Sequence, residues 1–126
     1  MKTGDLKIGD TAQLSRRYTA EDIRGFAALA GVAPESVEAV PEPLIAALFS
    51  YLLGVELPGR GTNYLKQELA YLKPARLDET LTARVTITRL RPEKHLCDLE
   101  TRLTDARGEI LATGRALVFV RDVGAA

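Results

Sequence analysis

The sequence contains very little histidine, cysteine or tryptophan. Its 126 residues include one histidine, one cysteine and no tryptophan. A single cysteine excludes an intrachain disulfide framework and a cysteine-rich metal site, and it suits a reducing compartment. Because His95 is the only histidine, any histidine-dependent acid–base chemistry uses this residue or comes from another chain. We therefore expect no disulfide, no metal and no cofactor.

The sequence also lacks an excess of either charge and any long hydrophobic run. Seventeen basic residues balance seventeen acidic ones, so no global field favours nucleic acid or an anionic membrane. The most apolar run, Leu44 to Leu53, is about half of the roughly 20 residues that span a bilayer. The first ten residues have no apolar core of signal-peptide length. These features predict a soluble, cytoplasmic protein with one domain over residues 1–126.

Two helices are predicted in the first half of the chain. Thr19 is a good N-cap, residues 20–30 have helical spacing of apolar positions, and Gly31 follows as a stop signal. Pro43 suits the first turn of a second helix, which we expect to end at Gly54. Because this helix is apolar nearly all round, we expect it to be buried on most sides as the centre of the fold.

The remainder of the sequence predicts strands. The segment "GDTAQLSRRYT" alternates loosely, and later strands are expected at residues 61–74, 79–92, 94–104 and 109–122. The clearest alternation places Leu81, Ala83, Val85 and Ile87 on one face and Thr or Arg on the other. Four successive strands predict an antiparallel meander. The fold class is therefore α+β, with a sheet packed on a buried helix.

Several isolated residues are most simply explained as structural. The glycine-rich stretch "GVELPGRGT" (54–62) lacks the Gly-Lys-Ser/Thr of a phosphate loop, so we interpret it as a helix-to-strand turn, with Arg60 as a weak phosphate contact. His95 is expected in a solvated turn, and Cys97 in the core. Ser50 lies in the apolar helix, where its hydroxyl usually bonds the preceding turn.

Three glutamates precede the apolar helix, and Glu42 is the best placed of them. It stands immediately before Pro43, so we expect it at the helix N-terminus, where the helix dipole favours a carboxylate. Two interpretations remain open for Glu42. It either caps the helix or acts as a general base at the mouth of an apolar tunnel, with Glu38 as a second candidate.

Most of the chain resembles the MaoC-like dehydratases, also called (R)-specific enoyl-CoA hydratases. The resemblance is carried by "IGDTAQLSRRYTAEDIRGFAALAG", by "GEILATGRALVFV" and, most specifically, by "LPGRGTNYLKQELAYLKPARLDETLTARVTI". It implies the hot dog fold, an antiparallel sheet wrapped around one central helix. It also implies a dimer that binds an acyl thioester of coenzyme A or of acyl carrier protein.

The acid–base motif of that family is missing from this sequence. The family hydrates its substrate with an Asp–His pair in a Gly-Asp-x-Asn-Pro-x-His motif. Here the matching stretch begins at Gly31 and reads "GVAPES", with Val32 in place of the aspartate and Ser36 nearest to the histidine position. Pro41 and Glu42 stand where the family has His-Gly. The departure argues against hydratase activity in an isolated homodimer, because Val32 cannot accept a proton.

Three interpretations follow from the resemblance and remain open. The protein is a degenerate thioester binder or the non-catalytic subunit of a heteromer with a motif-complete homologue. Alternatively, it is a thioesterase in which Glu42 or Glu38 activates water. A third interpretation is a structural or regulatory dimer with a filled tunnel.

The predicted substrate contacts come from the central helix and the segment after it. Leu44, Leu48, Tyr51 and Leu52 are candidate tunnel walls, and Asn63, Tyr64 and Arg60 are candidate contacts to the thioester or its carrier.

Overall fold

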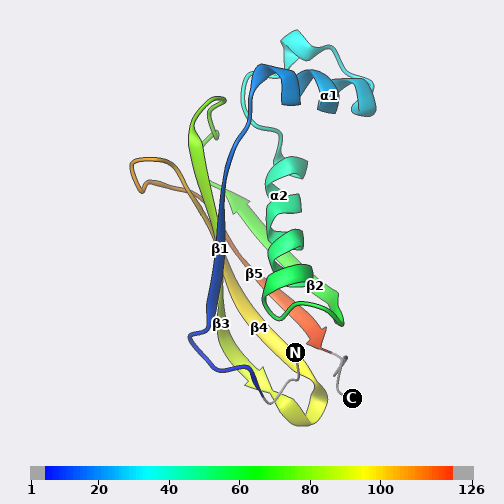
Figure 1. Ribbon diagram of the computed structural model, residues 1–126, viewed down its shortest axis with the longest axis vertical. Coiled ribbons are helices and arrows are strands. Elements are labelled where there is room, and N and C mark those ends of the chain that lie inside the picture. Colours follow the sequence, from blue (N-terminus) through cyan, green and yellow to red (C-terminus); the bar gives the residue numbers. More distant parts are fainter. Residues whose placement is uncertain (1–4, 121–126) are drawn as a thin grey trace.

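The computed structural model describes residues 5–120, in which one five-stranded antiparallel sheet wraps around a helix (Figure 1). This confirms the predicted α+β class. Each predicted strand is present, and the part of the last prediction beyond residue 120 lies outside the described residues. The strands are β1 (Thr11–Arg17), β2 (Thr62–Tyr71), β3 (Thr80–Arg91), β4 (Leu96–Thr104) and β5 (Ile110–Val120).

The first helix, α1 (Ala20–Ala30), forms as predicted. The Thr19 hydroxyl accepts a hydrogen bond from the Asp22 N–H, and the Asp22 carboxylate accepts one from the Thr19 N–H. This reciprocal capping box fixes the start of the helix. Gly31 closes it at a φ of 75°, a left-handed conformation that glycine adopts without strain. A short 3₁₀ turn, η2 (Pro34–Ser36), follows.

The second helix, α2 (Glu42–Tyr51), is the central helix, but it does not end at Gly54. The chain continues as a π-helical turn, η3 (Leu52–Glu56), in which the Leu57 N–H donates to the Leu52 carbonyl at 2.7 Å. A wider turn of this kind accommodates glycine without terminating the helical path. The predicted helix stop at Gly54 was therefore wrong.

Only one side of α2 and η3 is buried in the single chain. Ile45, Leu48, Phe49, Leu52 and Leu53 pack into the core beneath the helix. The opposite side remains open, with Tyr51 49% exposed and Val55 60% exposed. The expectation that this helix is buried on most sides was wrong for one chain, because the sheet covers a single face of it.

The strand order is β1-β3-β4-β5-β2. The predicted meander is confirmed for β3, β4 and β5 but wrong for β2, which lies at the far edge beside β5. Residues 72–79 then return across the end of the sheet. Three backbone hydrogen bonds hold this segment. The Leu72 N–H donates to the Leu111 carbonyl, and the Asp78 N–H donates to the Tyr18 carbonyl. The Ala75 carbonyl accepts from the Val40 N–H. Because β4 and β5 lie between β2 and β3 in the sheet, the chain has to make this long crossing from one strand to the next.

The two faces of the sheet differ as the alternation predicts. Leu81, Ala83, Val85 and Ile87 of β3 are buried beneath α2. The other face is polar and is crossed by ion pairs such as Arg115–Glu68, at 3.2 Å. The core therefore lies mainly between the sheet and the helix formed by α2 and η3.

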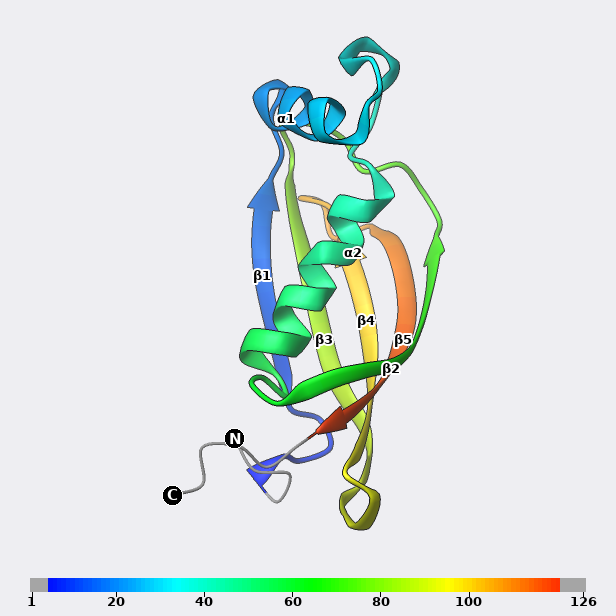
Figure 2. The same ribbon diagram turned by 90° about the vertical axis from the view of Figure 1, so that its right-hand side faces the viewer.

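The close approach of β2 to β5 depends on Gly114. This residue pairs with Leu69 across the two strands, between Ala112 and Ala116. A Cβ at position 114 would lie 1.9 Å from the Glu68 carbonyl oxygen. Glycine is required here because no side chain fits between the two backbones. Figure 2 shows the resulting curve of β2 along the lower end of α2.

Replacing Gly114 with alanine should destabilise the protein by about 1–3 kcal/mol, because the added methyl group forces β2 away from β5. Gly25 is the matched control, since it lies within α1 and a Cβ there meets nothing within 4 Å. Gly25→Ala should stabilise by roughly 0.5–1 kcal/mol. Urea unfolding of both variants measures the difference, and equal stability of Gly114→Ala and wild type would refute the close-approach argument.

Asp105 organises the hairpin between β4 and β5. Its carboxylate accepts hydrogen bonds from the backbone N–H groups of Arg107 and Glu109, both at 2.9 Å. These hydrogen bonds hold the pKa of Asp105 below its usual value, and the bond from the Glu109 N–H has the largest effect. A lowered folded-state pKa contributes stability that is present above the unfolded-state pKa and is lost as the pH falls through the folded-state value.

The Asp105→Asn variant should therefore be less stable than wild type at neutral pH, because an amide is a weaker acceptor than a carboxylate. The difference should shrink as the pH falls below the ordinary aspartate pKa of about 3.9. Urea unfolding of both proteins across this range tests the linkage. A difference that stays constant with pH would show that the Asp105 charge contributes nothing.

Candidate functional site

The N-terminus of α2 carries an exposed carboxylate beside a tyrosine. Glu42 follows the N-cap Pro41, and Pro43 also lies in the first turn. The Tyr71 hydroxyl donates to the Glu42 backbone carbonyl at 3.3 Å. Burial raises the pKa of Tyr71, and the negative charge of Glu42 raises it further. Glu42, Tyr71 and Ile45 line a groove of about 290 Å³ at this end of the helix.

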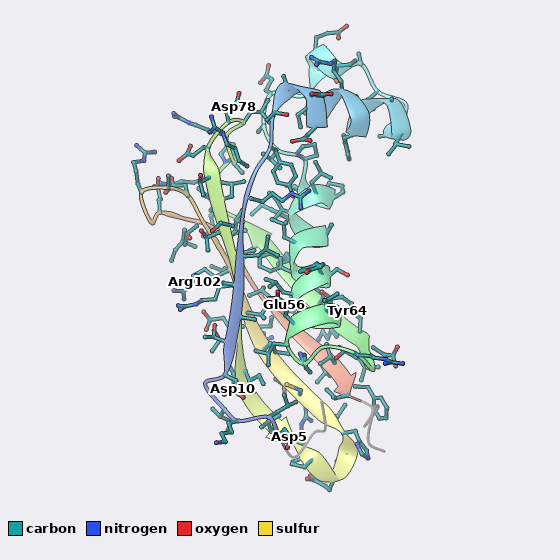
Figure 3. The ribbon with its side chains drawn as sticks, viewed as in Figure 1. Asp5, Asp10, Glu56, Tyr64, Asp78 and Arg102 are labelled. Carbon is teal, nitrogen blue, oxygen red and sulfur yellow. The ribbon has the colours of Figure 1, made fainter. Side chains whose placement is uncertain are left out.

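A second contact joins α2 to β2 two turns further along the helix. The Ser50 side chain lies close enough to the Tyr64 hydroxyl to offset part of the rise that burial causes in the pKa of Tyr64, whereas the sequence suggested that Ser50 bonds its own helix. Burial raises the pKa of Tyr64, so its hydroxyl remains protonated and available as a donor near neutral pH. Figure 3 shows Tyr64 on β2 beside the lower end of α2.

These two contacts delimit what we call the α2–β2 strip. On the helix, Glu42, Ala46 and Ser50 are four residues apart, so they share one face. On the strand, Tyr64, Gln67 and Tyr71 pair with the core-facing residues of β5, which directs their side chains to the same side as α2. The strip therefore combines one carboxylate, three hydroxyls and one amide along an edge of the sheet.

Sequence reasoning recognised only part of the α2–β2 strip. The four-residue spacing of Glu42, Ala46 and Ser50 was available from the sequence as a signal. The contribution of Gln67 and Tyr71 was not, because it depends on β2 lying at the β5 edge.

The predicted tunnel walls lie on the other side of α2. Leu44, Leu48 and Tyr51 line a groove of about 490 Å³ between α2 and β1. Leu52 does not line it, because this side chain is fully buried in the core. We call this cavity the α2–β1 groove. Its full lining is Leu14, Arg16, Tyr18, Leu44, Ala47, Leu48, Tyr51 and Glu56.

The remaining predicted substrate contacts are distributed around the turn before β2. Arg60 is exposed there, between Gly59 and Gly61 at φ values of 91° and 95°. This confirms the turn interpretation of the glycine-rich stretch. Asn63 is exposed and pairs with Phe119. The structure therefore brings Tyr64 and Glu42 to one strip but places the other predicted contacts elsewhere.

The segment before α2 holds the residues that replace the expected acid–base pair. Val32 is 45% exposed, and the Ser36 hydroxyl donates to the Ala33 carbonyl at 2.6 Å. Glu35 and Glu38 are also exposed. Figure 1 shows α1 and η2 projecting beyond the end of the sheet. Within residues 5–120, no acid or base side chain is hydrogen-bonded to Ser36, and its hydroxyl proton is donated to the Ala33 carbonyl.

The single histidine and the single cysteine lie far from α2's N-terminus. His95 follows the turn η4 (Pro92–Lys94) at a φ of 57°, and it is half-buried against Phe119 rather than fully solvated as predicted. Cys97 is buried as predicted, and burial raises the pKa of its thiol to about 12. Such a thiol is protonated near neutral pH and is a poor nucleophile.

The structure shows neither a metal cluster nor a membrane-spanning helix within residues 5–120. No three His, Cys, Asp or Glu side chains of this range converge as metal ligands. No helix in the same range has the length and apolar character needed to cross a membrane.

Comparison with known proteins shows similarity along nearly the whole chain. No family model matches the sequence. The (R)-specific enoyl-CoA hydratase of Aeromonas caviae is 36% identical over 131 residues, which cover 94% of this chain and 98% of that protein. The enzyme of the same name from Rhodospirillum rubrum is 33% identical over 129 residues, covering 92% and 89%. The solved structure of the A. caviae (R)-hydratase involved in PHA biosynthesis superposes with a TM-score of 0.83, at 35% identity over 92% of this chain and 98% of that one.

Proposed function

Because the chain belongs to the MaoC-like (R)-specific enoyl-CoA hydratase family and has its hot dog fold, we propose that it binds an acyl thioester but does not hydrate the acyl chain on its own. The thioester is that of coenzyme A or of acyl carrier protein. The observation that carries the proposal is that Val32 and Ser36 stand where the resemblance places the family's Asp–His pair.

The local structure supports the loss of hydration chemistry. Hydration across Cα and Cβ requires a group that activates water and a group that delivers a proton. An exposed valine and a serine bonded to the Ala33 carbonyl supply neither. Pro41 and Pro43 also lack the backbone N–H groups that would stabilise an oxyanion at the start of α2.

The α2–β2 strip is the place where we expect the thioester to bind. Tyr64 and Ser50 offer hydroxyl donors to a carbonyl oxygen, and Ala46 leaves room for a chain beside the helix. The predicted contacts Asn63 and Arg60 adjoin this strip in sequence and remain proposals.

A second subunit would close the open side of this strip. Among the strands of residues 5–120, β2 pairs only with β5, so its other edge presents backbone groups that no described strand pairs. Tyr64 and Leu65 on this edge are 39% and 56% exposed, and no charged residue occurs from Leu44 to Val55 on α2 and η3. We therefore propose a dimer through β2, formed with a second copy or with a motif-complete homologue.

A cytoplasmic location remains a prediction.

The purified protein should show no hydration of crotonyl-CoA at the rates of an active hydratase. Acyl-CoAs of graded chain length should nevertheless raise its melting temperature, because a ligand that binds only the folded state stabilises it. A coupled assay and a thermal-shift series measure the two properties. Normal hydration by the protein alone would overturn the loss of chemistry, whereas the absence of any shift would favour the purely structural dimer with a filled tunnel.

A thioesterase is the second candidate function, and the groove at Glu42 favours it. This carboxylate lies over a groove whose walls include Ile45, Tyr71 and Ala75, at the positive end of the α2 dipole. A carboxylate there can activate water toward a thioester carbonyl. Glu38, the alternative predicted base, is exposed on the segment that precedes α2.

If the protein hydrolyses acyl-CoA, Glu42→Gln should reduce the rate by about 100-fold or more, because the amide cannot act as a general base. Glu38→Gln is the matched control and should retain the rate. Release of free thiol from acyl-CoA measures both variants. Unchanged hydrolysis in Glu42→Gln would exclude Glu42 as the base.

A further inference from the structure

The α2–β1 groove is a second cavity, separate from the proposed thioester site. It opens on the β1 side of α2, whereas the α2–β2 strip lies on the β2 side. Its volume of about 490 Å³ falls within the usual range of small-molecule sites, roughly 300–1,000 Å³. A dimer through β2 leaves it open, because β1 is at the opposite edge of the sheet.

The floor of the groove is apolar and elongated. Leu14 comes from β1, and Leu44, Ala47, Leu48 and Tyr51 come from α2. Leu44 and Tyr51 are seven residues apart, which corresponds to about 10 Å along a helix axis. This length suits an extended aliphatic chain of medium length.

The positively charged side chain of Arg16 also lines this groove. The guanidinium of Arg16 lies 5.8 Å from the centre of the Tyr18 ring. No ion pair found within residues 5–120 includes Arg16, although other basic residues are paired. Among the described residues, the Tyr18 hydroxyl makes one hydrogen bond, a long contact to the Leu44 carbonyl at 3.5 Å. Arg16 and Tyr18 therefore offer donors to an anionic head group.

The far end of the groove carries the opposite charge. Glu56 lines the cavity beyond Tyr51, and Figure 3 shows it near the lower end of α2. A carboxylate there repels a second negative charge on the ligand. The cavity therefore matches a ligand with one anionic head and an uncharged tail.

We infer that the α2–β1 groove binds an aliphatic monocarboxylate, with the carboxylate on Arg16 and the chain along Leu44, Leu48 and Tyr51. This inference does not depend on thioester binding in the α2–β2 strip. Its ligand is a free acid, the chemical class that thioester hydrolysis releases.

Isothermal titration calorimetry with decanoate tests the groove, using 1-decanol and decanedioate as matched ligands. Decanoate should bind about tenfold more tightly than 1-decanol, because a hydrogen bond to a charged group is worth more than one to a neutral group. Decanedioate should bind more weakly than decanoate because of Glu56. Equal affinity for the three ligands, or no binding of decanoate, would overturn the inference.

Two pairs of variants locate the ligand. Ala47 is exposed on the groove, so Ala47→Trp should fill the cavity and abolish decanoate binding without disturbing the core. Ala28→Trp, at an exposed position of α1, should leave binding unchanged. Arg16→Gln should lower the affinity for decanoate about tenfold and leave that for 1-decanol unchanged. Arg84→Gln, exposed on the other face of the sheet, should affect neither ligand.

The thermal shift caused by acyl-CoA separates this inference from the proposed function. Ala47→Trp should retain that shift, since the thioester binds on the other side of α2. Loss of both decanoate binding and the acyl-CoA shift would mean that the thioester itself occupies the α2–β1 groove, and a second site would be refuted. Decanoate binding without any acyl-CoA shift would refute the proposed function and leave this inference standing.

Discussion

The packing of α2 and η3 against the sheet is the contact on which the rest of the structure depends. Ile45, Leu48, Phe49, Leu52 and Leu53 are all buried in it. Complete burial of such side chains contributes about 1.5–3 kcal/mol each, so together they supply on the order of 10 kcal/mol. That is comparable to the whole stability of a typical domain. The small β5 residues beneath, with Gly114 among them, allow β2 to curve close enough to complete this core.

Sequence patterns predicted those features that are determined locally. The N-cap at Thr19, the helix stop at Gly31 and the alternation along β3 each depend on residues within a few positions of one another. The position of β2 in the sheet is not determined locally. Periodicity along a strand indicates which of its side chains are buried, but it does not indicate which strand is its neighbour. β2 is also an edge strand with mostly exposed residues, so its alternation is weak. The error at β2 therefore also concealed the α2–β2 strip, whose members meet only across that edge.

The distribution of burial explains how the proposed loss of the family's acid–base pair is compatible with the fold. From Gly31 to Ala39 every residue is exposed or half-buried, and the turn at η2 is held by local backbone bonds. Substitutions at Val32 and Ser36 therefore remove little buried surface. Changes within α2 would instead leave cavities beneath the helix. The proposed loss of hydration chemistry is compatible with a stable hot dog domain for this physical reason.

The two sides of α2 differ in what they need from a partner chain. The α2–β2 strip lies beside a strand edge that no described strand pairs, so a ligand there would contact a surface that the proposed second subunit would complete. The α2–β1 groove is lined entirely by residues of one chain and lies at the opposite edge. Binding in the strip should therefore weaken as the protein is diluted and a dimer dissociates, since association is governed by mass action. Binding in the groove should be independent of protein concentration, because the groove is complete in each chain.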